Sequence, residues 1–414
     1  MKSITTLSIL GLAVVVSLGT TALAESPWNQ FRGPAGDGLS AEKGLLESWP
    51  ADGPPELWRL DLGPAFSGIT AAGDHLFTMT SDADGEYAVS LDLATGREVW
   101  RTRVGGQFEE SFGNGPRSTP AIDGDRVFVL VSRGDLHALG RKDGAVQWSV
   151  DFKEAFGVEI PRRGFSGSIV LADDLLILQP GGPGGRSLAG VDKTSGEVRW
   201  TTGEDATGYS TPLLVGAGKE RRAIVLSPTH ALAVTPAGKV LWRHEFGPDI
   251  GVKPAIPVQV APDQFFFSAS YDLGGLLLRE IGEGAERRVE EVWTSRAMRN
   301  HFNASVEIDG FLYGFDNATL KCLKVADAST AWAKRGGLGK GSLIYADGRL
   351  IVLTETGELR LVAADPEAYR ELGRVQALSG RSWTSPTLYR GHLIVRNVAE
   401  IVAYDLRQAS GGES

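Results

Sequence analysis

The stretch Leu91-Asp92-Leu93-Ala94-Thr95-Gly96-Arg97-Glu98-Val99-Trp100 contains a glycine that is followed four residues later by a tryptophan. The same spacing recurs further along the chain, in Gly144–Trp148, Gly196–Trp200 and Gly238–Trp242. Three more tryptophans continue the series: Trp58, Trp293 and Trp332. Successive tryptophans lie 42, 48, 52, 42, 51 and 39 residues apart, and a further step of 43 reaches Val375. The mean period of about 45 residues is typical of the four-stranded blade of a β-propeller.

Each repeat contains four short segments with the residue alternation of β-strands. Between Ser118 and Trp148, Asp123-Gly124 and Asp143-Gly144 separate the alternating runs, and Asp-Gly is a strong hairpin-turn signal. The third segments keep a small residue, which close packing of the sheets would require: Ser90, Ala138, Gly190, Ala233, Cys322 and Ala403. We therefore expect Cys322 to be a small buried residue and not a nucleophile.

The two ends of the repeat region complement each other. Leu57–Leu62 has the pattern of a fourth strand without the three strands before it, whereas residues 383–406 supply three strands without a fourth. Pairing them completes one blade and removes the edges that an open stack would expose. The sequence thus predicts an all-β fold, an eight-bladed β-propeller of four-stranded antiparallel blades that is closed by its N- and C-terminal strands. Seven blades remain the alternative if the irregular 250–300 region is not a full blade.

The repeat tryptophans are expected to be structural and to pack between neighbouring blades. They are Trp58, Trp100, Trp148, Trp200, Trp242, Trp293 and Trp332. A role in stacking on a cofactor is the alternative. Trp28 and Phe31 anchor a segment before the first blade that has no strand periodicity, and we expect this segment to cap the ring.

The first 24 residues have the organisation of a secretory signal peptide. Lys2 gives a positive start, residues 4–18 are mostly apolar, and Ala22-Leu23-Ala24 provides a small-x-small cleavage pattern. A membrane anchor is the alternative, but the apolar run stops short of the roughly 20 residues of a span. No cysteine follows the run, so a lipoprotein is not expected. We expect a periplasmic or extracellular protein with a signal peptide at 1–24, a capping segment at 25–50, one propeller domain at 51–407 and a disordered tail at 408–414.

Composition excludes several function classes. Lys plus Arg is 42 and Asp plus Glu is 51 in 414 residues, a net charge of −9, which argues against nucleic-acid binding. A single cysteine excludes an internal disulfide and a C-x-x-C-H haem site. No H-E-x-x-H zinc motif or G-x-S-x-G nucleophile elbow occurs. No catalytic residue can be named, and we expect a monomer without a membrane span after signal cleavage.

The blade ending at residues 91–100 and its copy at 191–200 resemble the pyrroloquinoline-quinone-like (PQQ-like) β-propeller repeat family. Trp28-Asn29-Gln30-Phe31-Arg32-Gly33-Pro34 and Gly115-Pro116-Arg117-Ser118-Thr119-Pro120 look like a secreted bacterial subgroup typical of planctomycete-like genomes. The resemblance covers residues 28 to about 406 and implies a quinoprotein alcohol dehydrogenase-like fold. The family includes quinoprotein dehydrogenases and barrel-assembly scaffolds, so it leaves the function open.

A quinoprotein dehydrogenase of this family would hold PQQ beside a bound Ca²⁺, usually with adjacent cysteines near the quinone. Cys322 stands alone in this sequence. Three alternating carboxylates, Asp82, Asp84 and Glu86, are weak candidates for Ca²⁺ ligands because that ion prefers oxygen donors. A solvated hairpin turn is the alternative explanation of the same residues.

The starts of the innermost strands converge around one mouth of a propeller's central channel, and cations and aromatic residues recur there. The candidate ligand-binding residues are Arg117, Arg163, Phe165, Tyr209, Lys253, His301, Phe302, Asn303, Lys340, Arg381 and Trp383. Such a cluster would focus positive potential in an acidic protein and would suit a flat or extended anion through charge-assisted hydrogen bonds and stacking. PQQ, a carboxylate-rich peptide or a glycan fits this description; the alternative is that these residues only satisfy strand ends.

Two functions follow from different classes. The first is a non-catalytic secreted scaffold that binds a protein, a peptide or a small anion at one channel mouth. The second is a PQQ- and calcium-dependent quinoprotein oxidoreductase. The lone cysteine and the absence of a haem motif favour the first.

Overall fold

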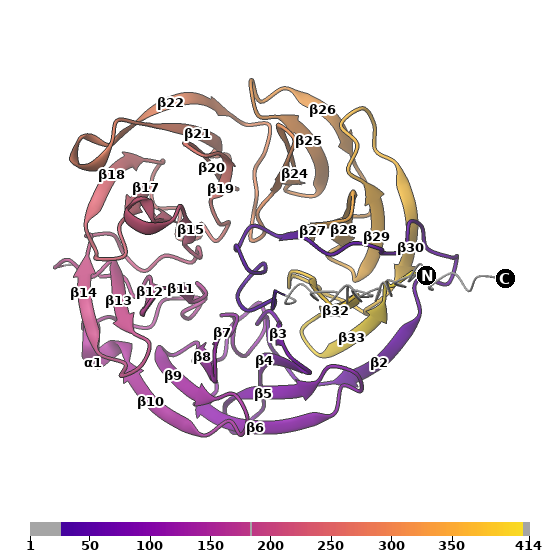
Figure 1. Ribbon diagram of the computed structural model, residues 1–414, viewed down its shortest axis with the longest axis horizontal. Helices are drawn as coiled ribbons and strands as arrows, with labels where there is room; N and C mark the ends of the chain where they lie inside the picture. Colours follow the sequence, from indigo (N-terminus) through magenta and orange to yellow (C-terminus); the bar gives the residue numbers. More distant parts are fainter. Residues whose placement is uncertain (1–25, 183, 409–414) are drawn as a thin grey trace, which may run out of the picture.

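A computed structural model describes residues 26–182 and 184–408. Within them, eight antiparallel sheets surround a central axis as the blades of a β-propeller (Figure 1). Seven sheets have four strands, and the seventh blade gains a fifth from the N-terminal segment. The predicted all-β, eight-bladed fold is confirmed. The predicted signal peptide and the tail beyond Gln408 lie outside the described residues.

The first four blades follow one another along the chain. Blade 1 contains β3 (Thr70–Ala72), β4 (His75–Ser81), β5 (Glu86–Asp92) and β6 (Glu98–Gly105). Blade 2 contains β7 (Ala121–Asp123), β8 (Arg126–Leu130), β9 (Asp135–Gly140) and β10 (Val146–Asp151). Blade 3 contains β11 (Val170–Ala172), β12 (Leu175–Leu178), β13 (Leu188–Asp192) and β14 (Val198–Thr202). Blade 4 contains β15 (Leu213–Val215), β16 (Arg222–Leu226), β17 (His230–Val234) and β18 (Val240–Glu245).

The irregular 250–300 region forms a full blade, which decides for eight blades over seven. Blade 5 contains β19 (Val258–Ala261), β20 (Gln264–Ala269), β21 (Gly274–Ile281) and β22 (Arg288–Ser295). Blade 6 contains β23 (Val306–Ile308), β24 (Phe311–Asp316), β25 (Thr319–Lys324) and β26 (Thr330–Lys334). Blade 7 contains β27 (Ser342–Ala346), β28 (Arg349–Leu353), β29 (Glu358–Ala363) and β30 (Glu371–Gln376). Short helical segments are α1 (Phe152–Phe156), η1 (Gly218–Glu220) and η2 (Gly284–Glu286).

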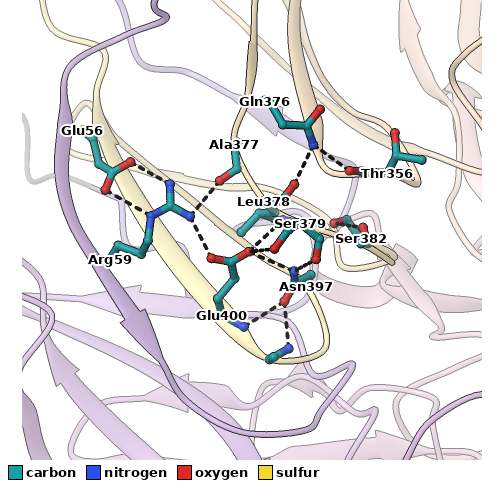
Figure 2. Close-up of polar contacts among 12 residues, drawn as sticks. Glu56, Arg59, Thr356, Gln376, Ala377, Leu378, Ser379, Ser382, Asn397 and Glu400 are labelled. Carbon is teal, nitrogen blue, oxygen red and sulfur yellow. Dashed lines mark hydrogen bonds and ion pairs between the residues drawn. The ribbon is translucent and has the colours of Figure 1, made fainter.

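Blade 8 joins the two ends of the repeat region. It combines β31 (Thr387–Tyr389), β32 (His392–Arg396) and β33 (Glu400–Asp405) with β2 (Glu56–Asp61) from the other end. Strand β2 pairs antiparallel with β33, with Trp58 opposite Ala403. Arg59 of β2 also donates to the Ala377 carbonyl of blade 7 and to Glu400 of β33, at 3.0 and 2.8 Å (Figure 2). The predicted closure by terminal strands is therefore present.

The Gly-x-x-x-Trp repeat works as a two-sided connector between blades. Each repeat indole is largely buried, and its Nε1 donates to the next blade. The acceptors are carbonyls at Leu93, Arg141, Lys193, Pro236, Val325 and Asp365, and the Glu280 carboxylate for Trp242. The glycine of the repeat, in turn, receives the indole of the preceding blade: Gly96 lies against Trp58, Gly144 against Trp100, Gly196 against Trp148 and Gly238 against Trp200.

The small residues of the third strands are explained by packing within their own blade, and not by the close packing of sheets that we expected. Each stands opposite the tryptophan of its own blade in the strand register, as in Ser90 opposite Trp100 and Cys322 opposite Trp332. The indole therefore lies over its cross-strand partner before it reaches the next sheet. Cys322 is fully buried, and burial raises the pKa of its thiol to about 11, as expected of a packing residue.

The hydrophobic core is divided among the blade interfaces. One cluster joins Phe77 and Met79 of blade 1 to Val127 and Val129 of blade 2, and similar clusters fill the following interfaces. The largest spans blades 7, 8 and 1 and includes Trp49 of the N-terminal segment. The ring is thus held by contacts between sheets, and blades stabilise their neighbours.

The N-terminal segment plugs the central channel before it runs to the rim of the ring (Figure 1). Trp28 bridges to Ala71 of blade 1, and β1 (Leu39–Ser40) pairs in parallel with β27 of blade 7. Between them, the fully buried Arg32 donates to the carbonyls of Ser305 and Leu343 at 3.2 and 3.3 Å. The plug therefore contacts several innermost strands at once and closes one end of the channel.

Candidate functional site

One cavity of about 410 Å³ opens at the mouth opposite the plug, where the innermost strands begin. Residues that precede the innermost strand of every blade line it, and Phe31 of the plug contributes to it as well. Because each blade contributes a loop at the same height, residues far apart in sequence meet there.

Nine of the eleven ligand-binding candidates line this cavity. They are Arg117, Arg163, Tyr209, His301, Phe302, Asn303, Lys340, Arg381 and Trp383. The convergence expected from the repeat is present for these residues. Whether they bind a ligand stays a prediction.

Phe165 and Lys253 do not line the cavity. Phe165 is 2% exposed and packs edge-on against Phe152 of α1, with ring centroids 5.3 Å apart. Lys253 turns away from the channel, and its ammonium donates to the Phe246 carbonyl at 2.6 Å. Burial lowers the pKa of Lys253 to about 8. Both residues stabilise the loops that surround the mouth. Their position before an innermost strand is the same as that of the cavity-lining residues, so the sequence pattern could not distinguish the two roles.

The loop between β6 and β7 lies over the mouth and carries two residues that sequence reasoning missed, Glu110 and Phe112. The Glu110 carboxylate forms ion pairs with Arg117 and Arg163, and its side chain is 6% exposed. The Phe112 ring lies 4.3 Å from the Arg163 guanidinium carbon, and its carbonyl accepts a 2.6 Å hydrogen bond from Arg381. The length of this loop, with glycines on both sides, was the available signal.

Aromatic rings form a continuous row at the mouth. Trp383 stacks on Phe66 with centroids 5.6 Å apart and contacts Phe302 at 4.8 Å. His301 and then Tyr271 extend the row, joined by a 3.0 Å hydrogen bond between the imidazole Nε2 and the phenol oxygen. The Tyr271 side chain is 55% exposed, so the row reaches solvent.

The segment that carries Arg381 and Trp383 is fixed from both sides. Glu400 and Asn397 of blade 8 bind the Ser379 backbone and side chain next to it (Figure 2). The Trp383 indole Nε1 donates to Glu355 at 2.9 Å. The other Glu355 oxygen accepts from the Lys340 backbone N–H at 2.9 Å.

Several polar groups of the cavity have no partner among the described residues, among them the Nδ1 atom of His301. The Lys340 ammonium forms no hydrogen bond or ion pair there, although the Lys340 backbone is held by Glu355. Ser385 is 6% exposed, and its Oγ is likewise without a hydrogen bond. A buried hydroxyl without a partner is costly, so the Ser385 Oγ favours a ligand at the mouth, and the half-buried Lys340 ammonium is a further unused donor there.

Burial shapes the electrostatics of the mouth. Burial, followed by the nearby Lys340 cation, lowers the pKa of His301 to about 4, against the weaker opposing effect of Glu355. Burial also lowers the pKa of Arg117, to about 10. At neutral pH, His301 is therefore uncharged, and the positive charge of the mouth comes from arginine and lysine.

A second groove of about 390 Å³ continues outward from the mouth between the 159–163 and 249–253 loops. It shares Arg163, Tyr209 and Val252 with the central cavity. The two hollows therefore form a connected surface that is wider than a single small molecule requires.

The residues present do not fit a calcium-bound quinone. Among the residues that line the cavity, Glu355 is the only carboxylate, and it already accepts from the Trp383 indole and the Lys340 backbone N–H. Across residues 26–182 and 184–408, no group of three or more His, Cys, Asp or Glu side chains could hold a metal ion.

The weak metal candidates are not gathered around a common point. Asp82 accepts the backbone N–H groups of Asp84 and Gly85 in a turn, at 2.8 and 3.1 Å. Glu86 instead accepts the Ser132 N–H of blade 2 at 2.9 Å, and burial raises the pKa of its carboxyl group. A turn and an interblade contact therefore explain these carboxylates.

The fold and the mouth together define a plugged β-propeller with a cationic, aromatic surface at one end of its channel. The chain belongs to the PQQ-like repeat family described as outer membrane protein assembly factor BamB, whose model matches residues 50–151 and 109–334. The expected family is thereby confirmed; the resemblance to planctomycete proteins stays a prediction.

Among curated relatives, outer membrane protein assembly factor BamB of Yersinia pestis is 24% identical over 243 residues, 52% of this chain and 56% of that protein. The Burkholderia pseudomallei protein of the same name is 23% identical over 248 residues, 57% of this chain and 60% of its own. The matches thus span less than two thirds of the length of these relatives.

Solved structures share the fold at low identity. The structure of BamB from Moraxella catarrhalis is similar with a TM-score of 0.59 and 15% identity, covering 86% of this chain and 99% of that one. Quinohemoprotein alcohol dehydrogenase from Comamonas testosteroni has a TM-score of 0.66 and 12% identity, covering 94% and 82%. Within the described part of the chain, no helix combines the length and apolarity that crossing a membrane needs.

Proposed function

We propose that this protein is a non-catalytic binding propeller of the periplasmic or extracellular space that docks an acidic segment of a protein partner at the channel mouth. The observation that carries the proposal is the mouth itself, where cations and an aromatic row from all blades surround one cavity. Exposed aromatic rings beside desolvated cations are typical of the anchoring residues of protein interfaces. The name of the curated relatives, outer membrane protein assembly factor, also supports work on protein partners.

A quinoprotein oxidoreductase is the second candidate because dehydrogenases share the fold. The scattered carboxylates, which form no metal-ligand group among the described residues, argue against it. We therefore assign no catalytic residue and expect the protein to act as a monomeric scaffold.

The test uses a short oligoglutamate peptide, with oligoglutamine as the neutral comparison. Binding is followed by tryptophan fluorescence and calorimetry, because Trp383 lies in the cavity. The double variant Lys340→Ala/Arg381→Ala should weaken oligoglutamate binding at least about tenfold, since hydrogen bonds to charged groups contribute roughly 1.5–3 kcal/mol each.

A matched control removes two exposed cations from the outer turns of blades 1 and 2, Arg97→Ala/Lys142→Ala. This control has the same net charge as the mouth variant and should bind normally. Equal weakening in both variants would mean that charge alone, not the mouth, attracts the peptide. A saturable shift with PQQ and Ca²⁺ that is lost in the mouth variant would favour the oxidoreductase instead.

A further inference from the structure

The loop over the mouth makes the contacts that a bound acidic ligand would make. Glu110 is the only carboxylate paired with Arg117 and Arg163 in the described part of the chain, and it is nearly buried between them. Arg117 also holds the base of the loop, donating to the Gly113 and Gly115 carbonyls at 2.8 and 2.7 Å. A carboxylate of the protein itself thus occupies the position between these two arginines of the mouth.

Phe112 completes this imitation of a ligand. Its ring contacts the Arg163 guanidinium and lies 6.0 Å from Trp383. Its carbonyl accepts from Arg381, which comes from the opposite end of the sequence. Even so, Phe112 remains 45% exposed, so only part of its surface is buried in the mouth.

Local geometry defines the shape of the occupying segment. Glu110-Ser111-Phe112-Gly113 is a tight turn in which the Gly113 N–H donates to the Glu110 carbonyl at 2.9 Å. The Glu110 carboxylate also accepts the Phe112 N–H at 2.8 Å. Gly113 has a φ of +139° and Gly115 a φ of +91°, conformations that glycine adopts readily. Gly113 ends the turn and Gly115 follows it, whereas Gly105 ends β6 and Gly106 begins the loop.

From these contacts we infer that the partner presents a tight turn with a carboxylate and, two residues later, an aromatic ring, and that this turn displaces Glu110-Ser111-Phe112 from the mouth. The inference rests on the proposed function and names the feature that the mouth recognises. When the loop is displaced, Arg117, Arg163 and Arg381 become available to bind the partner. Lys340 and Ser385 provide further donors, which the loop does not use.

The outer groove gives the rest of the partner a path. It begins at Arg163 and Tyr209, beside the position of Phe112, and runs between two surface loops. A turn seated in the mouth would therefore direct one flanking arm along this groove. A small free anion bound in the mouth would not extend into this second groove.

The test uses a cyclised peptide with the sequence of residues 109–114, which holds Glu110 and Phe112 in the turn. Calorimetry compares its dissociation constant for the wild-type protein and for the variant Glu110→Gln/Phe112→Ala. The variant has lost the internal competitor, so we expect it to bind the peptide at least about tenfold tighter. Phe112→Ala alone changes only a half-exposed ring, and it tests the same point if the double variant folds poorly.

Matched controls lie in the same loop and in the peptide. Glu109 is exposed beside Glu110, so the protein variant Glu109→Gln should bind like the wild type. Peptides carrying Glu110→Gln or Phe112→Ala should bind the loop variant at least about tenfold more weakly than the parent peptide.

Two results would overturn the inference. Equal peptide affinity for wild type and loop variant would mean that the loop is a fixed wall of the site. A peptide that fails to bind either protein, while oligoglutamate still binds at Lys340 and Arg381, would reject the acidic–aromatic turn and leave the proposed function intact. If oligoglutamate also fails, the proposed function itself falls.

Discussion

Gly96 of blade 1 lies so close to the Trp58 indole of blade 8 that a Cβ at position 96 would stand 2.5 Å from Cε3 of the ring. Trp58 in turn donates through Nε1 to the Leu93 carbonyl, three residues before Gly96, at 2.9 Å. The turn that precedes the last strand of one blade is thus the seat for the indole of the blade before it. The same seating at Gly144, Gly196 and Gly238 explains why glycine and tryptophan recur together.

Gly96→Ala should destabilise the protein by about 1–3 kcal/mol, because the added methyl group overlaps the indole. Gly73→Ala in the same blade is the matched control. Both glycines have a positive φ, +70° and +60°, but nothing lies within 4 Å of a Cβ at position 73. Urea unfolding of the two variants separates the packing effect from the backbone strain they share. Equal losses would contradict the seating.

Trp332→Ala should reduce the free energy of unfolding by about 3–5 kcal/mol, because it leaves a large cavity between blades 6 and 7. Trp332→Phe should cost about 1–3 kcal/mol, since it keeps most of the packing but leaves the Asp365 carbonyl without its 2.8 Å donor. Chemical unfolding measures both. A Trp332→Ala protein as stable as the wild type would show that the indole is not a wedge between sheets.

Arg32→Ala should destabilise the plug by about 2 kcal/mol or more, because it removes a fully buried side chain and its donors to Ser305 and Leu343. Arg407→Ala serves as the control, since that side chain is 56% exposed and pairs with Asp405 on the surface. The control should change stability by about 1 kcal/mol or less. Thermal and urea unfolding provide the comparison, and similar losses in both variants would mean that Arg32 does not secure the plug.

Acid should weaken the fold partly through His301. Its pKa is about 4 in the folded protein against 6.5 for an ordinary histidine, and burial is the main cause. Between these values the unfolded chain binds the proton and the folded chain does not, so this contribution is fully present above pH 6.5 and is lost as the pH falls toward 4. The fall in melting temperature from neutral to acidic pH should be smaller in His301→Gln. An unchanged fall in that variant would locate the acid sensitivity elsewhere.

Much of the fold was predictable because the contacts between blades are made by residues at the same positions of successive repeats. The indole, the glycine that it packs against and its cross-strand partner recur at fixed places in the repeats, so counting from Trp58 to Val375 favoured eight blades. At the last interface, Val375 stands where an indole is expected, and Gly53 lies against it with 2.6 Å from a Cβ at position 53 to the valine Cβ. The spacing therefore predicted this interface although valine replaces the tryptophan there.

The candidate site was only partly predictable. Entrances to the innermost strands are recognisable in sequence, and nine of the eleven residues named from them line the cavity. Phe165 and Lys253 also precede innermost strands, but Phe165 packs against α1 and Lys253 donates to the Phe246 carbonyl, so neither side chain lines the cavity. Glu110 and Phe112 sit in a loop whose path over the mouth depends on Arg381, a residue 269 positions away.

The sequence alone determined the class of fold and the way the ring closes, and it favoured eight blades over seven, because those features rest on contacts that repeat at a fixed spacing. The tertiary structure alone decided which cations of the mouth are already paired, that the N-terminal segment plugs the channel through Arg32, and that one loop covers the opposite end. These features depend on single contacts between residues that are far apart in the sequence, and such contacts cannot be predicted from a periodic pattern.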